Sequence, residues 1–227
     1  MYLLTETASP FALERWAAFF ANFGQFAKGF FYTLGISIGA LIVALLLGLI
    51  FGAMSSTHNK VLRGISRVYV EIFQNTPLLV QFVVVFYGIS ILTDGHVMIP
   101  ISLTAILCVG VYTGAYISEI IRTGIEAVPK GQTEAALSQG FTYADTMRII
   151  ILPQAVRTIL PPLTNQVVNL IKNTSTVAII SGADIMFTAK AWAYDTTNYG
   201  AAFLYFIMCF PLATWARRKE EENKKAY

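Results

Sequence analysis

A long apolar run at residues 29–54, without one charged side chain, constrains this chain more than any other feature. About 20 mainly apolar residues are enough for a helix to cross the hydrocarbon core of a membrane. Four similar runs follow, and the fourth is the most polar, because Arg157 lies near its start and Lys172 well inside it. We therefore expect an all-α membrane protein with five transmembrane helices, at residues 29–54, 68–93, 97–121, 155–180 and 200–216.

The composition supports this fold class and argues against several functions. Hydrophobic residues make up 56% of the chain and charged residues only 13%, whereas a soluble domain carries about 25% charged residues. The net charge of +3 gives no sign of nucleic-acid binding, which normally shows as a basic patch. The cysteines and histidines form no metal-binding motif, and no Gly-x-x-x-x-Gly-Lys-[Ser/Thr] loop is present to bind ATP phosphates. We expect no metal, no cofactor and no catalytic residue in this chain.

Lysine and arginine gather in the loops of one side, which the positive-inside rule assigns to the cytoplasm. The N-terminal segment 1–28 is therefore expected to be extracellular or interfacial, and the segment 131–153 and the basic tail 217–227 to be cytoplasmic. The basic residues on the cytoplasmic side are Lys60, Arg63, Arg67, Arg122, Lys130, Arg148, Arg157, Arg217, Arg218, Lys219, Lys224 and Lys225.

The segment 131–153 separates the third and fourth apolar runs and is more polar than either of them. Gly131 or a neighbour can begin a helix, with Glu134 near its positive end. Gly140 is expected to leave a notch without a side chain, and Pro153 to mark the boundary of the next element. Two interpretations are open: a docking element held outside the membrane, or an amphipathic helix that lies on the lipid headgroups.

Seven residues of this segment keep a specific spacing, namely Glu134, Ala135, Ala136, Gly140, Ile150, Leu152 and Pro153. Flanking patterns occur at residues 76–81, 115–125, 128–132, 153–157, 160–165 and 172–175. The spacing resembles the EAA loop of permease subunits in bacterial ABC importers. The flanking stretches resemble the polar amino acid permeases in particular, and the resemblance extends over about residues 29–216.

This resemblance implies a fold, a mechanism and a set of partners. The fold is that of a type I ABC importer permease, with an ABC-type-1 transmembrane domain at 29–216 and a cytoplasmic coupling helix within 131–153. Family members pair two permeases with two cytoplasmic ATPases, which bind ATP and Mg²⁺, and an extracellular binding protein delivers the amino acid. A homodimer, or a pair with a close relative, is therefore the expected transport unit. It would work by alternating access in the bacterial cytoplasmic membrane.

The fourth apolar run carries polar residues at separations of 4, 3, 1 and 3 positions. A helix with about 3.6 residues per turn places them on one side. One hypothesis is that they line the substrate path, with Lys172 opposite a substrate carboxylate, and the other is that Lys172 forms a structural ion pair with Glu119 or Glu71. Weaker pathway candidates are Thr76 and Gln81. The residues of the polar stripe are Asn165, Asn169, Lys172, Asn173 and Thr176.

An ion-coupled secondary amino acid transporter is the alternative function, and it would need carboxylates near the midplane or broken helices. Among the acids, Glu71 alone leans toward the middle of a span. Asp184 and Lys190 are expected to be solvated residues of an external loop. Small residues four positions apart allow close helix packing, either within the chain or between subunits. They are Gly35 and Gly39, Gly48 and Gly52, and Gly110 and Gly114.

Overall fold

The computed structural model describes residues 13–193 and 200–225; the remaining residues of the N-terminal segment, of one loop and of the tail lie outside this description. Within it every regular element is helical, which confirms the all-α prediction. The elements are α1 Leu13–Ala21, α2 Phe23–Ser55, α3 Lys60–Asn75, α4 Leu78–Val83, η1 Val84–Gly88, α5 Ile89–Leu92, α6 Ile101–Glu126, α7 Lys130–Ser138, α8 Tyr143–Asp145, η2 Thr146–Ile151, α9 Leu152–Asn173, η3 Thr174–Ile180, α10 Ile185–Ala193 and α11 Gly200–Lys225.

The centre of the molecule is the contact between α2 and α6, where glycines replace larger side chains. Gly48 and Gly52 of α2 lie against Ile117 and Ile121 of α6, and a Cβ atom built on Gly48 would lie 2.4 Å from Cγ2 of Ile117. Of the six small residues paired in the sequence, only Gly35 faces open space. The other five therefore serve packing within the chain, because they let two backbones approach closely.

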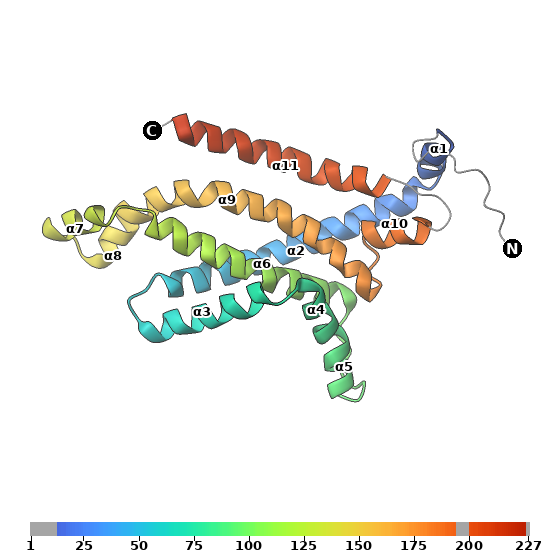
Figure 1. Cartoon of the computed structure of the whole chain (residues 1–227), viewed down its shortest axis with the longest axis horizontal. Helices are drawn as coiled ribbons and strands as arrows, with labels where there is room; N and C mark the ends of the chain where they lie inside the picture. Colours follow the sequence, from blue (N-terminus) through green and yellow to red (C-terminus); the bar gives the residue numbers. More distant parts are fainter. Residues whose placement is uncertain (1–12, 194–199, 226–227) are drawn as a thin grey trace.

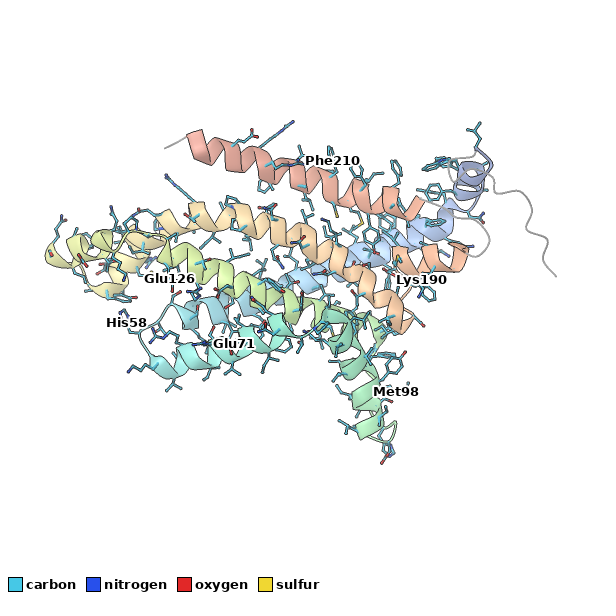
Figure 2. The ribbon with its side chains drawn as sticks, viewed as in Figure 1. His58, Glu71, Met98, Glu126, Lys190 and Phe210 are labelled. Carbon is cyan, nitrogen blue, oxygen red and sulfur yellow. The ribbon has the colours of Figure 1, made fainter. Side chains whose placement is uncertain are left out.

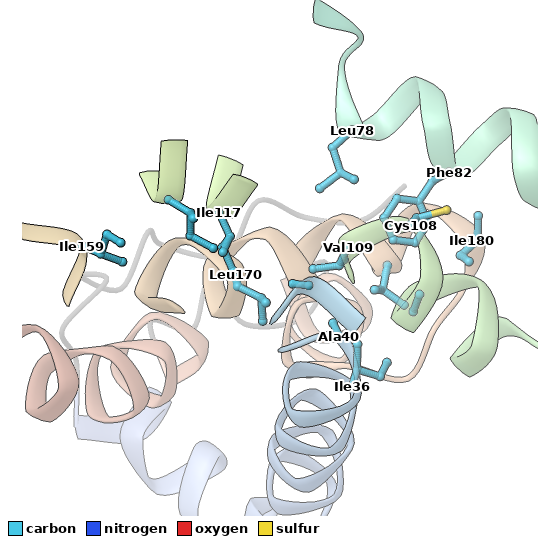
Figure 3. Close-up of a cluster of buried hydrophobic side chains, with 14 of the residues drawn as sticks. Ile36, Ala40, Leu78, Phe82, Cys108, Val109, Ile117, Ile159, Leu170 and Ile180 are labelled. Atoms are coloured by element: carbon cyan, nitrogen blue, oxygen red, sulfur yellow. The ribbon is translucent and has the colours of Figure 1, made fainter. Parts of the chain in front are cut away.

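Two apolar clusters join α2 and α6 to part of the remaining helices. The first joins α2, α4, α6, α9 and η3, and its side chains include the fully buried Phe82 and Ile117 (Figure 3). The second cluster joins α1, α2, α9, α10 and α11, with Phe19 and Phe26 buried among them. The helix α11 belongs to the second cluster, and it lies along α9 on one side of the bundle (Figure 1).

In the part of the chain that is described, three helices are long and apolar enough to cross a membrane, and their spans are Phe23–Ser55, Ile101–Glu126 and Gly200–Arg218. The predicted continuous span 68–93 is different: it is broken, and α3 and the helix from Leu78 to Leu92 are bent by 98°. Thr76 is extended (φ −111°, ψ 133°), as expected for a residue before proline, and Pro77 cannot donate the hydrogen bond that would continue the helix.

The predicted fourth span, 155–180, is also not one α-helix. It consists of residues 155–173, which are most of α9, and of the 3₁₀ helix η3. By length and composition α9 is not among the three clear candidates for crossing a membrane. Its polar residues and its two internal prolines, Pro161 and Pro162, lower its mean hydropathy.

The elements sort clearly to the two ends of the molecule. Figure 1 shows α7, α8 and the C-terminal end of α11 at one end, and α1 and α10 at the other. The long α2 joins the two ends and presents large apolar side chains outward, among them Ile38, Ile42 and Leu46, which are each more than half exposed. A folded chain that leaves such side chains uncovered along a long helix is suited to lipid or to a protein partner.

Candidate functional site: the coupling segment and the polar face of α9

The first part of the site is α7, which carries the Glu-Ala-Ala sequence. Pro129 precedes it with φ −56°, and Ala136 is the one buried residue of the helix. Glu134 and Ala135 are exposed, and the Ser138 hydroxyl donates to the Glu134 carbonyl oxygen at 2.8 Å. The helix therefore presents most of its surface outward, as a docking element must.

Gly140 ends α7 through its backbone conformation. Its φ is +89°, a region that favours glycine. The Phe141 amide donates to the Ala136 carbonyl at 3.1 Å and the Gly140 amide to the Leu137 carbonyl at 3.0 Å. These two hydrogen bonds form a Schellman motif, which closes the C-terminal end of a helix. Gly140 was expected to leave a notch without a side chain. Its positive φ gives a stronger reason for glycine at this position.

The rest of the segment returns the chain to the bundle. The Thr142 hydroxyl accepts the Asp145 amide at 3.2 Å and donates to the Asp145 carboxylate at 2.5 Å, which caps α8. The π-helical turn η2 then runs into α9 at Leu152 without leaving the right-handed helical region (φ −59°, ψ −42°). Pro153 lies in the first turn of α9, where the π-helical turn gives way to the α-helix.

The second part of the site is the polar face of α9. Asn165, Asn169 and Lys172 are exposed, whereas Asn173 is half-buried. Thr176 is also half-buried and lies in η3, because the α-helix has already ended at Asn173. The structure therefore brings three of the five predicted stripe residues onto one exposed face and sets Thr176 apart from them.

The proposed structural partners of Lys172 are engaged elsewhere. Glu119 forms an ion pair with Arg122, whose Nε lies 2.9 Å from Oε2 of Glu119, and Glu71 pairs with Arg67 at 2.7 Å. Within residues 13–193 and 200–225 no ion pair to Lys172 is formed. The alternative of a fixed pair with Glu119 or Glu71 is wrong, because both acids have a closer arginine on their own helix.

Thr76 and Gln81 meet at the break before α4. The Gln81 side-chain amide donates to the Thr76 hydroxyl at 2.8 Å and to the Phe73 carbonyl at 3.2 Å. The Thr76 hydroxyl itself donates to the Ile72 carbonyl at 2.8 Å. The Gln81 amide thereby satisfies the Phe73 carbonyl, which Pro77 leaves without a helical donor, and the hydrogen bonds of both side chains brace the bend.

Sequence reasoning missed Asp184, which was expected to be solvated and is fully buried. Its Oδ1 accepts the Phe187 amide at 2.8 Å, and its Oδ2 accepts the Tyr205 hydroxyl at 3.1 Å. Burial raises the pKa of the Asp184 carboxyl above its ordinary value, although these hydrogen bonds act in the opposite direction. An aspartate just before an apolar helix is a typical N-cap, and that signal was available.

Residues 44–218 match the model of a family described as binding-protein-dependent transport system inner membrane component. The chain belongs to this family. Its members are transport components, so ATP hydrolysis belongs to a partner chain, and this chain is a multi-pass protein of the cytoplasmic membrane. In the described residues no cluster of three or more His, Cys, Asp or Glu side chains could hold a metal ion.

Two curated members of the family are similar over nearly their whole length. The probable glutamine ABC transporter permease protein GlnM of Bacillus subtilis (strain 168) is 37% identical over 216 residues, which cover 92% of this chain and 97% of the relative. The glutamate/aspartate import permease protein GltJ of Escherichia coli (strain K12) is 35% identical over 214 residues, covering 86% of this chain and 87% of the relative.

A solved structure supports the same assignment. The crystal structure of an amino acid ABC transporter with histidines superposes with a TM-score of 0.82 at 31% identity and covers 91% of this chain and 97% of that chain. The type I importer permease architecture is thereby confirmed. The alternative of an ion-coupled secondary transporter is wrong, because fold and relatives both belong to binding-protein-dependent importers.

Proposed function

We propose that this chain is the permease subunit of an importer for a polar amino acid. Two copies, or one copy and a close relative, would form the path, with two cytoplasmic ATPases that bind ATP and Mg²⁺ and an extracellular binding protein. The names of the similar relatives support the substrate class, since glutamine, glutamate and aspartate are polar amino acids.

The single observation that carries the proposal is the exposed α7 with its Schellman end. A short helix that is almost fully exposed, yet closed by two backbone hydrogen bonds at Gly140, is suited to seat as a rigid body in a groove of another protein. We assign ATPase coupling to this helix and to the residues that return it to the bundle. The coupling residues are Glu134, Ala135, Ala136, Gly140, Ile150, Leu152 and Pro153.

We assign the substrate path to the exposed face of α9. Asn165, Asn169 and Lys172 lie on a helix whose neighbours in the chain leave them uncovered, and polar groups at membrane depth need a water-filled cavity or a partner. A second permease copy that faces this surface would enclose such a cavity. Closure of the ATPases on ATP would then move α7, and α9 would move with it, because α7 packs against η2 and η2 runs into α9 without a break.

The test uses the complex of this chain with its partner ATPase in liposomes, with a binding protein and single amino acids. We expect ATP hydrolysis to require the ATPase subunit and to rise when binding protein and a polar amino acid are both present. Hydrolysis that does not respond to any loaded binding protein, in a complex that assembles normally, would overturn the proposal. Uptake of a radiolabelled amino acid identifies the substrate.

A further inference from the structure

The loop 56–59 between α2 and α3 is fixed to both helices. The Ser55 and Ser56 hydroxyls donate to the Gly52 carbonyl of α2 at 2.7 and 3.0 Å. Asn59 caps α3, because its side-chain oxygen accepts the Val61 amide at 2.9 Å. A displacement of this short loop therefore displaces the start of α3 as well.

His58 in this loop touches the coupling segment. Its ring meets the ring of Tyr143, the first residue of α8, edge to face, with centroids 5.1 Å apart and an interplanar angle of 80°. Figure 2 shows His58 and Glu126 at the end of the molecule that carries α7 and α8. Because Thr142 caps α8, the Tyr143 backbone is held in place by the coupling segment itself.

Two cavities flank this ring contact. One, of about 700 Å³, lies between the loop and the coupling segment, and the other, of about 770 Å³, lies between α3 and α6. His58 and Ser56 line both. The ring contact therefore links the loop to the coupling segment between two hollows.

Along its length α3 is tied to α2 and α6 by side-chain hydrogen bonds to backbone carbonyls. The Ser66 hydroxyl donates to Phe51 at 2.7 Å, and the Tyr69 hydroxyl donates to Val111 at 2.7 Å. The side-chain amide of Gln74 donates to Ala115 of α6 at 3.2 Å. These bonds make α3 a well-held rod rather than a flexible link.

The far end of this rod is the bend at Pro77. Gln81, the residue that bridges the bend, holds the end of α3 through the Phe73 carbonyl and Thr76. Beyond the bend, α4 packs against η3, the helical turn that continues α9. A shift or rotation of α3 would therefore move α4 and, through it, η3, which adjoins the polar face of α9.

We propose that the loop 56–59 is a second point of transmission on the coupling segment, and that His58 is a positioning residue that passes movement of Tyr143 through α3 to the bend at Pro77. The inference rests on the proposed coupling role of the segment. It adds a route through the first cytoplasmic loop to the direct route through η2 and α9.

The first test compares His58→Ala, His58→Phe and Tyr143→Ala in the complete complex with ATPase and binding protein. Loss of an edge-to-face aromatic pair should lower the ratio of amino acid imported to ATP hydrolysed by about two- to ten-fold. We expect that loss for His58→Ala and Tyr143→Ala, no further loss in the double variant, and near-normal values for His58→Phe, which keeps a ring. Lys60→Ala, at the exposed start of α3, is the matched control and should be unchanged.

The unaltered complex separates failure of this inference from failure of the proposed function. If it shows no stimulation by loaded binding protein, the proposed function fails. If it is stimulated normally and His58→Ala imports as much substrate per ATP as the unaltered chain, the inference alone is overturned. Additive losses in the double variant would also overturn it, because residues that act through one contact are not additive.

A second test does not depend on loss of function. His58→Cys and Tyr143→Cys are joined by a short bifunctional maleimide, in a chain whose native Cys108 and Cys209 are replaced by alanine. The two substitutions remove the ring contact, so the unjoined complex should import less amino acid per ATP. Because the proposal has loop and coupling segment move together, we expect joining to restore import per ATP toward the value of the unaltered chain. Inhibition on joining, in a complex that keeps its bound ATPase, would show that the two segments separate during the cycle and would overturn the proposal.

Discussion

Single glycines set the distance between α2 and α6. A Cβ atom on Gly48 would lie 2.7 Å from the Cβ of Ile117, an atom that no side-chain rotation can move away. At Gly35 of the same helix the added atom would meet nothing within 4 Å. Two glycines of one helix therefore differ in what they contribute to the fold, and the difference can be measured.

We predict that Gly48→Ala lowers the free energy of unfolding by about 1–3 kcal/mol, the usual cost of overpacking a closely packed contact. Thermal unfolding in detergent micelles measures the change, and Gly35→Ala is the matched control. Equal loss for both substitutions would contradict the packing role of Gly48, since helix propensity acts alike at the two positions.

The buried carboxylate of Asp184 joins α10 and α11, and the neighbouring Ile185 amide adds a bond to α2. Tyr205 of α11 and the start of α10 donate to it, and the Ile185 amide donates to Thr33 of α2 at 3.2 Å. We predict that Asp184→Ala lowers the free energy of unfolding by about 1–3 kcal/mol, because buried donors lose their acceptor. Asp184→Asn keeps an oxygen for the Phe187 amide and should retain most of the stability.

The pH dependence of Asp184 follows from its raised pKa. A carboxyl whose pKa is higher in the folded than in the unfolded state stabilises the fold below its ordinary value of 3.8, and this contribution is lost as the pH rises through the raised pKa. We predict that Asp184→Asn becomes more stable relative to the unaltered chain as the pH rises above 3.8. Melting temperatures of both proteins in micelles across this range test it, and a constant difference would contradict it.

Two helical elements carry the proposed function, and each depends on how it ends. The coupling helix α7 is closed by Gly140 at φ +89°, whereas α9 gives way to a 3₁₀ helix at Thr174. The first ending makes α7 a rigid body, and the second limits the polar face of α9 to the residues before the change. A substitution in α7 or in α9 can therefore impair the proposed function of that helix and leave the structure of the other helix unchanged.

For α7 we predict that Gly140→Ala weakens the association with the partner ATPase, because an L-residue in a left-handed conformation costs about 1–2 kcal/mol and loosens the end of the helix. The amount of ATPase that co-purifies with the permease measures the effect. Gly131→Ala, on the same helix with open space around it, should bind as well as the unaltered chain. Normal ATPase binding and normal coupling in Gly140→Ala would contradict the prediction.

For α9 we predict that Lys172→Met reduces amino acid uptake about ten-fold or more, the loss expected when a hydrogen bond to a charged group is removed. Bound ATPase should stay at its normal amount, because Lys172 lies outside the coupling segment. Lys190→Met in α10, another exposed lysine, is the control. Unchanged uptake kinetics in a normally assembled complex would remove Lys172 from the substrate path.

At the scale of the whole molecule, the two ends of the bundle define a direction across the membrane. The coupling segment lies at the same end as the C-terminal end of α11, and α1 lies at the opposite end (Figure 1). The positive-inside rule predicts that the first of these ends faces the cytoplasm. The N-terminus would then be outside.

We predict that a membrane-impermeant maleimide labels Gln139→Cys only after the cytoplasmic face is opened, and labels His96→Cys in intact cells. Gln139 and His96 are both exposed, and the native cysteines are both buried, so background labelling should be low. Labelling of Gln139→Cys in intact cells would reverse the orientation and remove the basis of the coupling proposal.

The helical class and the family could be predicted from the sequence, and the proposed coupling segment was located in it. These follow from local properties: runs of apolar residues long enough to span a membrane, and a motif of specific spacing around Glu134 and Gly140. Both the apolar runs and the motif are local patterns, and neither depends on contacts between residues far apart in the chain.

The pair of Glu119 with Arg122 follows from their spacing on one helix, whereas the bend at Pro77, the burial of Asp184 and the contact of His58 with Tyr143 emerge from the folded structure. Hydropathy treats residues 68–93 as one apolar run, because it does not register that a proline has removed a backbone donor. An aspartate in a loop looks solvated until the helices that cover it are in place. The burial of Asp184 and the contact of His58 with Tyr143 depend on residues far apart in the chain, so packing rather than local sequence fixes them.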